Sequence, residues 1–327
     1  MNSASSATWS KKDDEMKSGS PKIRILVVIC FFANVVFLTL LSSSGAVVKF
    51  RYITSIYLQR FSDKDVPFKQ PEGVACNNKG ILIVADSGNG RLVRYTLQGE
   101  VPGTDSVEIR VNQLLYPVKV EINSKGEIYA FDRKQRSLVR LTPEGGFEEY
   151  LDPKGFPPPN SYVPRSFTLD KNDNVYVLDI LSERVLVLTP EGKYLRQIKF
   201  PEKYGFFSDI AVNFKGTVLL VDSVKGVVFS TSDNAANFTP LTESLKEYVR
   251  FPSSMTTDSR GRIYLVDRNG GSIVLLGQDG SFLGRQSGLG WKEGRLNYPS
   301  QMCINGEGLV FVADTRNNRV QIFKAVE

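Results

Sequence analysis

An aspartate recurs at a fixed position along most of this 327-residue chain, and a ring of carboxylates could bind a metal ion or exchange protons. The six aspartates stand fifteen positions after successive repeat starts, at Asp86, Asp132, Asp179, Asp222, Asp267 and Asp314. Because the residue is constant from repeat to repeat, a structural role is the favoured interpretation. In three repeats an arginine follows five residues later, at Arg91, Arg184 and Arg319. We therefore expect these aspartates to close turns, three of them through an ion pair.

Charged residues that differ from one repeat to the next are better candidates for binding. Positions one and two of each repeat stand where its innermost strand should start, at one mouth of the channel that a ring of repeats encloses. The charged residues found there are Glu72, Lys119, Arg165 and Asp209. Polar groups around a concave mouth predict a ligand site, and the alternative is a water-filled, mutually neutralised pore.

Glu121 is a further exception, because the same position in the other repeats holds Ala, Thr or Cys. In a strand, Glu121 lies on the same side as Lys119, two residues back. We expect its carboxylate to face Lys119 or channel water, since a buried carboxylate needs a partner. Glu121 therefore joins the candidate binding residues.

The sequence contains no histidine, and this removes several kinds of catalytic site. Imidazole is the usual general base near neutral pH and the commonest zinc ligand, so a Ser-His pair and a His-ligated metal are excluded. The three cysteines, Cys30, Cys76 and Cys303, have no CxxC spacing, which excludes zinc ribbons and thioredoxin-like redox motifs. The net charge of +6 is a mild basic bias that identifies no partner.

Cys76 and Cys303 belong to the first and last repeats, which become neighbours if the repeats close into a ring. In an oxidising compartment a disulfide between them would lock that closure. Two buried free thiols are the favoured alternative, because innermost strands can be too far apart for the Cα spacing that a disulfide needs.

Six repeats supply the elements that must position these residues. Their starts are 43 to 47 residues apart, at Pro71, Pro117, Pro164, Phe207, Pro252 and Pro299. Asn or Asp six positions on, and Gly nine positions on in five repeats, predict a turn. A β-rich strand then ends at the repeated aspartate, and two further strands follow. Four strands in about 45 residues predict an all-β, six-bladed β-propeller of four-stranded blades.

The last repeat ends at Glu327, before a fourth strand can form. Residues 50–58, FRYITSIYL, make an alternating strand ahead of the first repeat. We expect this N-terminal strand to complete the last blade and close the ring, because closure leaves no open sheet edge.

Two stretches identify the kind of repeat. Residues 288–323, GLGWKEGRLNYPSQMCINGEGLVFVADTRNNRVQIF, contain a glycine-rich linker, a YP pair, a VAD strand end and an N-x-R-V-x-I-F strand. Residues 71–95, PEGVACNNKGILIVADSGNGRLVRY, are nearly as close. Both resemble the NHL repeat, and the resemblance extends over roughly residues 50–327. It implies a six-bladed propeller but says little about function, which is carried by sites rather than folds.

The resemblance also implies which activities to consider. Amidating and streptogramin lyases of this kind rely on histidines, which this chain lacks. Gluconolactonase-like propellers hold calcium with acidic and amide side chains, and Glu72 and Asp209 are the candidate ligands here. However, Arg165 and Ser253 stand where that pattern has Asn or Asp. A calcium-assisted lactonase or esterase is therefore the alternative function. Some NHL propellers bind RNA, but an exported domain opposes a nucleic-acid partner.

The first fifty residues predict a membrane anchor. Residues 1–22, rich in Ser, Lys and Asp, predict a disordered cytoplasmic tail. Residues 23–48 predict a transmembrane signal-anchor helix in the lipid bilayer, because no charged residue occurs from Ile25 to Val48. The basic residues before it keep the N-terminus cytoplasmic. The alternative is a cleaved signal peptide, which would leave the protein secreted or periplasmic.

These observations together predict a single-pass membrane protein with an extracytoplasmic propeller over residues 50–327. The propeller is expected to bind a protein or glycan through its loop face and channel mouth, with no cofactor. Binding or scaffolding is favoured over catalysis.

Overall fold

The computed structural model describes residues 48–61, 64–158, 161–231 and 237–327. The predicted tail, residues 1–22, lies outside these ranges, and so does the predicted apolar helix, residues 23–48, apart from Val48. Within the described ranges, no helix is both long and apolar enough to cross a membrane.

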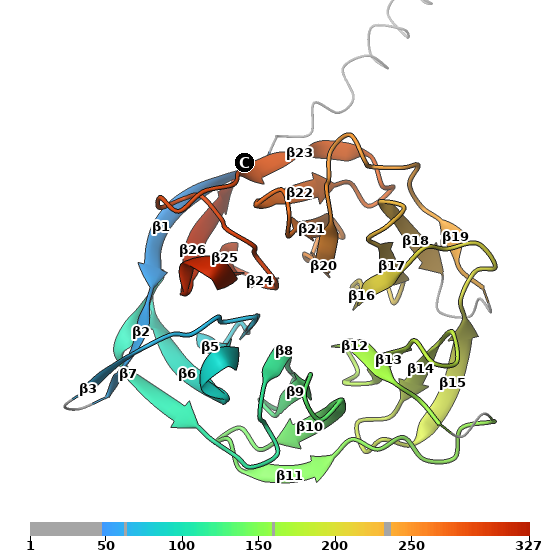
Figure 1. The fold of residues 1–327 in the computed structure, drawn as a ribbon, viewed down its shortest axis with the longest axis horizontal. Coiled ribbons are helices and arrows are strands. Elements are labelled where there is room, and N and C mark those ends of the chain that lie inside the picture. The colour runs from blue at the N-terminus through green and yellow to red at the C-terminus, as the bar shows by residue number, and fades with distance from the viewer. Residues whose placement is uncertain (1–47, 62–63, 159–160, 232–236) are drawn as a thin grey trace, which may run out of the picture. The chain divides into compact units, whose positions relative to one another are not determined.

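Six four-stranded antiparallel sheets surround a central axis, as predicted (Figure 1). Blade one consists of β4 (Gly73–Cys76), β5 (Ile81–Asp86), β6 (Arg91–Gln98) and β7 (Val101–Ile109). Blade two consists of β8 (Pro117–Ile122), β9 (Ile128–Asp132), β10 (Ser137–Leu141) and β11 (Phe147–Tyr150). Blade three consists of β12 (Pro164–Leu169), β13 (Val175–Asp179), β14 (Arg184–Leu188) and β15 (Tyr194–Lys199).

The other three blades repeat this order, with the innermost strand first. Blade four consists of β16 (Phe207–Val212), β17 (Val218–Asp222), β18 (Val227–Thr231) and β19 (Thr239–Pro240). Blade five consists of β20 (Pro252–Thr257), β21 (Ile263–Asp267), β22 (Ser272–Leu276) and β23 (Phe282–Ser287). Blade six consists of β24 (Met302–Ile304), β25 (Leu309–Asp314), β26 (Arg319–Val326) and β1 (Lys49–Ile56). Short 3₁₀ turns, η1 (Ser87–Asn89) and η2 (Thr315–Asn317), follow β5 and β25.

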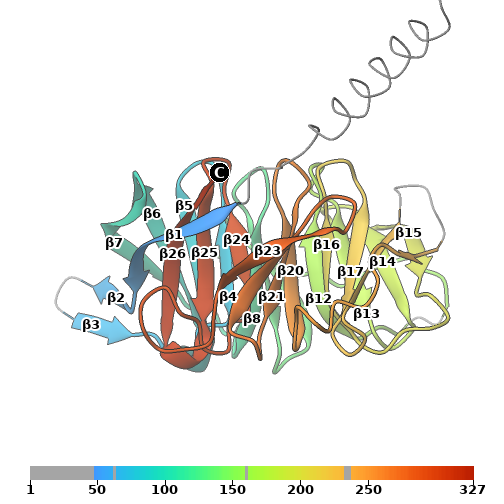
Figure 2. The ribbon, with the colours of Figure 1, turned by 90° about the horizontal axis from the view of Figure 1, so that it is seen from above.

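The predicted closing strand is confirmed. β1 pairs antiparallel with β26, from Lys49 opposite Val326 to Ile56 opposite Val320 (Figure 2). The ring centres of Phe50 and Phe323 are 5.9 Å apart, so the strand also adds an apolar contact to the last blade. The N-terminal strand therefore supplies the edge that the last repeat lacks.

A short hairpin, β2 (Leu58–Phe61) with β3 (Lys64–Pro67), follows the closing strand and was not predicted. Its Gln59 is buried, and the side-chain oxygen of Gln59 accepts a hydrogen bond of 2.6 Å from Arg91 of blade one. The hairpin is thereby attached to the ring next to the closure.

The hydrophobic core lies between the blades. Each of six clusters joins two neighbouring blades, including the pair that meets at the closure, where Val84 and Ile322 share one cluster. Both faces of a central strand are covered by adjacent blades, so every residue of β9, β13, β17 and β21 is buried. This explains why these strands are continuous apolar runs rather than alternating ones.

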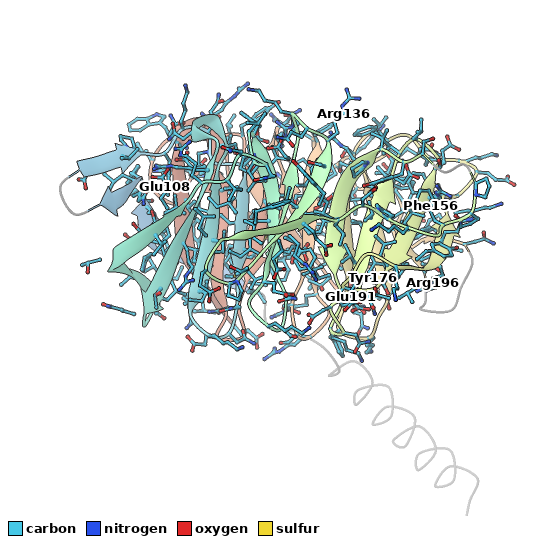
Figure 3. All side chains as sticks on the ribbon, turned by 90° about the horizontal axis from the view of Figure 1, so that it is seen from below. Glu108, Arg136, Phe156, Tyr176, Glu191 and Arg196 are labelled. Atoms are coloured by element: carbon cyan, nitrogen blue, oxygen red, sulfur yellow. A yellow bond between two sulfur atoms is a disulfide. The ribbon has the colours of Figure 1, made fainter. Side chains whose placement is uncertain are left out.

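The loops form two faces of the disc. Arg136, in the β9–β10 loop, lies at one face, and Glu191, in the β14–β15 loop, lies at the opposite face (Figure 3). We call the first of these face A and the second face B. The innermost strand of blade two begins at face A, because Pro117 pairs with Asp132 at the end of β9.

Candidate functional site

A small cavity of about 70 Å³ lies at the face A end of the central channel. All the predicted mouth residues line it, namely Glu72, Lys119, Arg165 and Asp209. The structure adds Arg133 and Arg268, which the sequence analysis did not select. The predicted gathering of charged residues at one mouth is therefore seen in the geometry.

A β-bulge explains how two consecutive residues can both reach this cavity. In blades two to five the strand pairing skips one residue at the start of the innermost strand: Val118, Arg165, Ser208 and Ser253. Each skipped residue and the residue after it line the cavity. A regular strand would turn alternate side chains to opposite faces, whereas a bulge re-aims a side chain.

The outer layer of the mouth is organised around Glu72. Its carboxylate accepts two hydrogen bonds from the guanidinium of Arg133, of 2.8 and 2.7 Å. Tyr116 donates a hydrogen bond of 3.1 Å to the same carboxylate, and Arg268 lies 3.8 Å from it. Burial and the Glu72 charge raise the pKa of the Tyr116 hydroxyl, so this hydroxyl stays a donor. We call Glu72, Arg133, Arg165 and Arg268 the arginine mouth.

Arg165 lies exposed at the same mouth with its guanidinium over the ring of Phe206, 5.1 Å from the ring centre. Although much of the side chain is exposed, the surrounding protein partly desolvates its guanidinium and lowers the pKa, and repulsion from Arg133 and Arg268 lowers it further. The pKa of Arg268 is lowered in the same way, by burial first and by Arg133. Glu72 raises the pKa of both arginines, but by less than burial and repulsion lower it.

An inner layer closes the channel beneath the arginine mouth. The ammonium of Lys119 lies 2.5 Å from the carboxylate of Asp209, and Ser166 donates a hydrogen bond of 2.5 Å to the same oxygen. The other oxygen accepts hydrogen bonds of 2.8 Å each from the Ser254 hydroxyl and the Met255 backbone N–H. We call Lys119, Ser166, Asp209 and Ser254, which come from four successive blades, the plug.

Gln301 of blade six completes this closure. Its side-chain oxygen accepts hydrogen bonds from the backbone N–H groups of Val74 (3.2 Å) and Val120 (3.3 Å). Its amide donates a hydrogen bond of 3.0 Å to the Val120 carbonyl. Gln301 thereby ties blade six to blades one and two.

Glu121 lies beyond the plug, in a second cavity of about 190 Å³ at the face B end. Its carboxylate is 3.8 Å from the ammonium of Lys119, on the side that the strand pattern predicted. It also accepts a hydrogen bond of 2.8 Å from the Leu169 backbone N–H. Burial raises the pKa of Glu121 to about 7, although the charge of Lys119 and hydrogen bonds from Leu169 and Thr168 lower it. Glu121 is therefore separated from the arginine mouth.

The six repeated aspartates are structural, as predicted. In blade three, Asp179 accepts hydrogen bonds from the Val163 and Ser182 backbone N–H groups, before the first strand and after the second. It also forms a buried ion pair of 3.0 Å with Arg184. The equivalent pairs are Arg91–Asp86 at 2.8 Å and Arg319–Asp314 at 2.7 Å. These carboxylates are fully committed to turns and cannot form a ring around the axis.

The residue that follows the repeated aspartate differs between blades, and in two of them it is Arg133 or Arg268. In three blades it is a hydroxyl residue that donates to the carbonyl of the residue opening the next blade: Ser87 to Pro117, Ser223 to Pro252 and Thr315 to Pro71. Blades two and five have arginine there instead, and blade three has Ile180. Comparing this position between repeats, as was done for positions one and two, would have found both residues.

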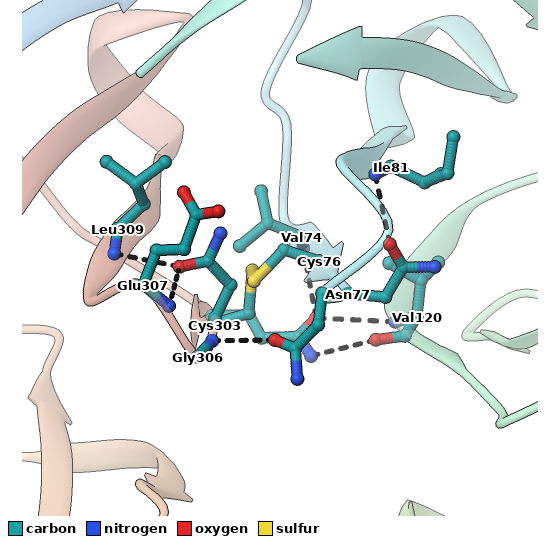
Figure 4. The surroundings of a disulfide bond; sticks show 12 residues. Val74, Cys76, Asn77, Ile81, Val120, Cys303, Gly306, Glu307 and Leu309 are labelled. Atoms are coloured by element: carbon teal, nitrogen blue, oxygen red, sulfur yellow. Dashed lines mark hydrogen bonds between the residues drawn. A yellow bond between two sulfur atoms is a disulfide. The ribbon is translucent and has the colours of Figure 1, made fainter. Parts of the chain in front are cut away.

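Cys76 and Cys303 form a disulfide in the structure, with their Cα atoms 6.0 Å apart (Figure 4). The bond joins the innermost strands of blades one and six across the ring closure. The expectation that innermost strands are too far apart is wrong for this pair, because blades converge toward the axis.

The carboxylates predicted for the calcium alternative do not suit a cation. Glu72 is bound by Arg133 and approached by Arg268, and Asp209 is bound by Lys119. Calcium needs six or more oxygen ligands, and positive side chains at this distance repel it. Over the described part of the chain, no group of three or more metal-ligating side chains occurs.

Comparisons with known proteins agree with this fold. The NHL repeat family model matches residues 68–95 and 296–323, which lie in the first and last blades. The chain is 26% identical to NHL repeat-containing protein 3 of Homo sapiens over 156 residues, 43% of this chain and 45% of that protein. It is 33% identical to the Mus musculus protein over 75 residues, 22% of each chain. The chain thus matches less than half the length of either relative.

Solved structures with low identity share the architecture. A virginiamycin B lyase of Staphylococcus aureus has a TM-score of 0.59 at 15% identity, over 85% of this chain and 100% of that one. A gluconolactonase of Xanthomonas campestris has a TM-score of 0.61 at 9% identity, over 85% and 94%. A chain of the nidogen/laminin complex has a TM-score of 0.54 at 15% identity, over 73% and 92%. At such identities only the fold is shared. The chain is thus a six-bladed β-propeller with NHL repeats in its first and last blades.

Proposed function

We propose that the propeller is a binding module that takes a protein or glycan ligand on face A, at the arginine mouth. The observation that carries this proposal is the departure from the repeat template at that mouth. Arg133 and Arg268 stand where three other blades have a hydroxyl residue that joins neighbouring blades. Replacing such a hydroxyl gives up a hydrogen bond between blades and places positive charge at a concave surface, which suits recognition better than stability.

The chemistry of the plug favours binding over catalysis. A catalytic carboxylate needs a free oxygen and a reacting group within reach. Asp209 instead accepts hydrogen bonds from Lys119, Ser166, Ser254 and the Met255 backbone. The chain also has no histidine to act as a general base.

We further propose that residues 23–48 anchor the protein in a membrane, with the propeller on the extracytoplasmic side. The uncharged stretch from Ile25 to Val48 supports an anchor, and the Cys76–Cys303 disulfide supports an oxidising compartment. Carbonate extraction of cell membranes tests the anchor, because an integral protein stays in the pellet. N-terminal sequencing of the mature protein distinguishes it from a secreted or periplasmic product of signal cleavage.

Glycosylation in a eukaryotic host tests on which side of the membrane the propeller lies. Asn237 is exposed and begins the glycosylation sequence Asn-Phe-Thr. If the propeller is exported, N-glycosidase treatment should increase the electrophoretic mobility of the wild type and leave an Asn237→Gln variant unchanged. An unglycosylated propeller that reacts only with reagents inside the cell would contradict the proposed topology.

Cross-linking on intact cells tests the ligand site. The wild type is compared with Arg165→Glu/Arg268→Glu, which reverses charge at the arginine mouth, and with Lys171→Glu as a control. Lys171 is exposed in the turn between β12 and β13, at the opposite end of the innermost strand. A ligand captured by the wild type and the control but lost from the mouth variant supports the proposal. A ligand captured equally by all three proteins places the binding site elsewhere, and no capture at all contradicts the binding function.

A further inference from the structure

The arginine mouth carries more positive charge than its own carboxylates neutralise. Four cationic and two anionic side chains line the cavity. Of these, Asp209 is paired with Lys119 in the plug. Glu72 therefore remains as the single carboxylate for Arg133, Arg165 and Arg268, and its two oxygens are already bound by Arg133.

Two guanidinium groups have unused donors. Among the described residues, the Arg165 guanidinium makes no hydrogen bond or ion pair, and its stacking on Phe206 leaves the N–H groups at its edge free. The Nε of Arg268 is buried without a hydrogen-bond acceptor in the same part of the chain. A buried donor without a partner is costly, so the charge of the Arg268 guanidinium is not fully compensated at the mouth.

Repulsion between the arginines also indicates that the positive charge of the mouth is not neutralised. The pKa values of Arg165 and Arg268 are both lowered, and other arginines of the mouth contribute to each shift. Like charges held together at a concave, partly buried surface attract an anion, because the anion relieves the repulsion that the fold imposes.

We propose that the arginine mouth binds the carboxylate of an aspartate or glutamate side chain that a protein partner presents. The inference rests on the proposed binding function and names the chemistry of its ligand. Arginine is the side chain best suited to this contact, because its planar fork can donate two parallel hydrogen bonds to one carboxylate. Arg165 supplies the free fork, and Arg268 supplies a second positive charge.

The size of the cavity favours an amino-acid side chain over an acidic sugar. A cavity of about 70 Å³ holds a carboxylate and its methylene group, roughly the space of a few water molecules. The carboxylate of an acidic sugar is attached to the ring itself, so the ring would have to enter the same space. A side chain carries its carboxylate away from the backbone on one or two methylene groups and can reach inward.

Calorimetric titration of the full-length protein in detergent micelles at low salt tests the inference. The probe is N-acetyl-aspartate amide, and N-acetyl-asparagine amide is its neutral control. We expect the aspartate probe to bind with a dissociation constant on the order of millimolar, since a single side chain offers few contacts. The asparagine probe should show no measurable binding, and added salt should weaken the aspartate probe.

Variants identify the residue that carries the contact. Arg165→Ala should weaken the aspartate probe at least tenfold, and Arg165→Lys should weaken it nearly as much, because lysine lacks the bidentate fork. Arg136→Ala is the matched control: it removes an exposed arginine from the same face, outside the cavity, and should leave binding unchanged. Equal unfolding midpoints show that each variant is folded.

Each other outcome overturns the inference. These outcomes are equal binding of the asparagine probe, no binding of either probe, and binding that Arg165→Ala does not reduce. Inorganic phosphate and glucuronate are titrated in parallel, and tighter binding of either one would assign the mouth to another kind of anion. The cross-linking result separates this failure from that of the proposed function: a ligand still captured by an Arg165→Ala variant leaves the binding module intact.

Discussion

Lys119 of blade two and Asp209 of blade four form an ion pair across the central channel, with 2.5 Å between ammonium nitrogen and carboxylate oxygen. The two side chains are only 10% and 3% exposed. Lys119 lines both cavities, so the pair separates the arginine mouth on face A from Glu121 on face B. A ligand bound at face A, as proposed, would therefore contact the plug but not pass it.

Breaking this pair should destabilise the fold far more than removing both charges. Lys119→Met and Asp209→Leu should each reduce the free energy of unfolding by about 3–5 kcal/mol, because each leaves a buried charge without its partner. The double variant should lose much less than the sum of the two. Urea denaturation measures all three, with Arg260→Ala as the control. Its pair with Glu327 is exposed and should contribute less than about 1 kcal/mol. Additive losses in the double variant would contradict the coupling.

Glu121 should make stability depend on pH. Burial raises its folded-state pKa to about 7, above its unfolded value of 4.5, so the folded protein binds the proton more tightly. The stabilisation from the protonated carboxyl is fully present below pH 4.5 and is lost as pH rises toward 7. A Glu121→Gln variant should match the wild type near pH 4.5 and exceed it by about 3 kcal/mol well above pH 7. Urea denaturation between pH 4.5 and 8 measures the difference, and parallel curves would show that Glu121 does not titrate as described.

Removing the carboxylate of the arginine mouth should strengthen anion binding. Glu72→Gln abolishes the negative charge that Arg133 and Arg268 share, so both guanidinium groups become available. We expect the affinity for N-acetyl-aspartate amide to rise about three- to tenfold, equivalent to about 0.7–1.4 kcal/mol. Calorimetry at constant ionic strength measures it. A weaker affinity would mean that Glu72 positions Arg133 for the ligand rather than competing with it.

The Cys76–Cys303 disulfide should contribute substantially to stability. It closes a loop with a sequence separation of 227 residues, and chain entropy predicts a contribution of up to about 5 kcal/mol. Cys76→Ser/Cys303→Ser should unfold at lower urea concentration than the oxidised wild type. Mass analysis after alkylation without reductant should find both cysteines unlabelled. Labelled thiols at the two positions would contradict the bond.

Calcium should not stabilise the protein. A cation bound only by the native state would raise the unfolding temperature, and Glu72 and Asp209 are instead paired with cationic side chains. We expect the thermal midpoint in millimolar calcium and in chelator to differ by less than about 1 °C. If calcium raised the thermal midpoint of the wild type by several degrees but not that of a Glu72→Gln variant, the result would support a calcium-assisted lactonase or esterase.

Local patterns in the chain were enough to predict the blades. Turn residues such as Asn123 and Gly126 and the constant Asp132 satisfy requirements within one repeat, and local hydrogen bonding makes such requirements visible in the chain. The closing strand was predictable for a related reason, because an unfinished last repeat needs one more edge and residues 50–58 have the alternating pattern to supply it. The candidate mouth residues could be identified because their residue types differ from those at the same positions in other repeats.

The pairing of those residues, in contrast, follows from the closed ring and not from spacing along the chain. Lys119 and Asp209 are 90 positions apart, and their contact depends on the narrow radius of the ring and on the bulges that turn both side chains toward the axis. The same closeness of the blades at the axis brings Cys76 to Cys303 and places Arg133 and Arg268 beside Glu72. Interactions within a repeat can be inferred from spacing along the chain, whereas interactions across a channel depend on distances that appear only when the ring is closed.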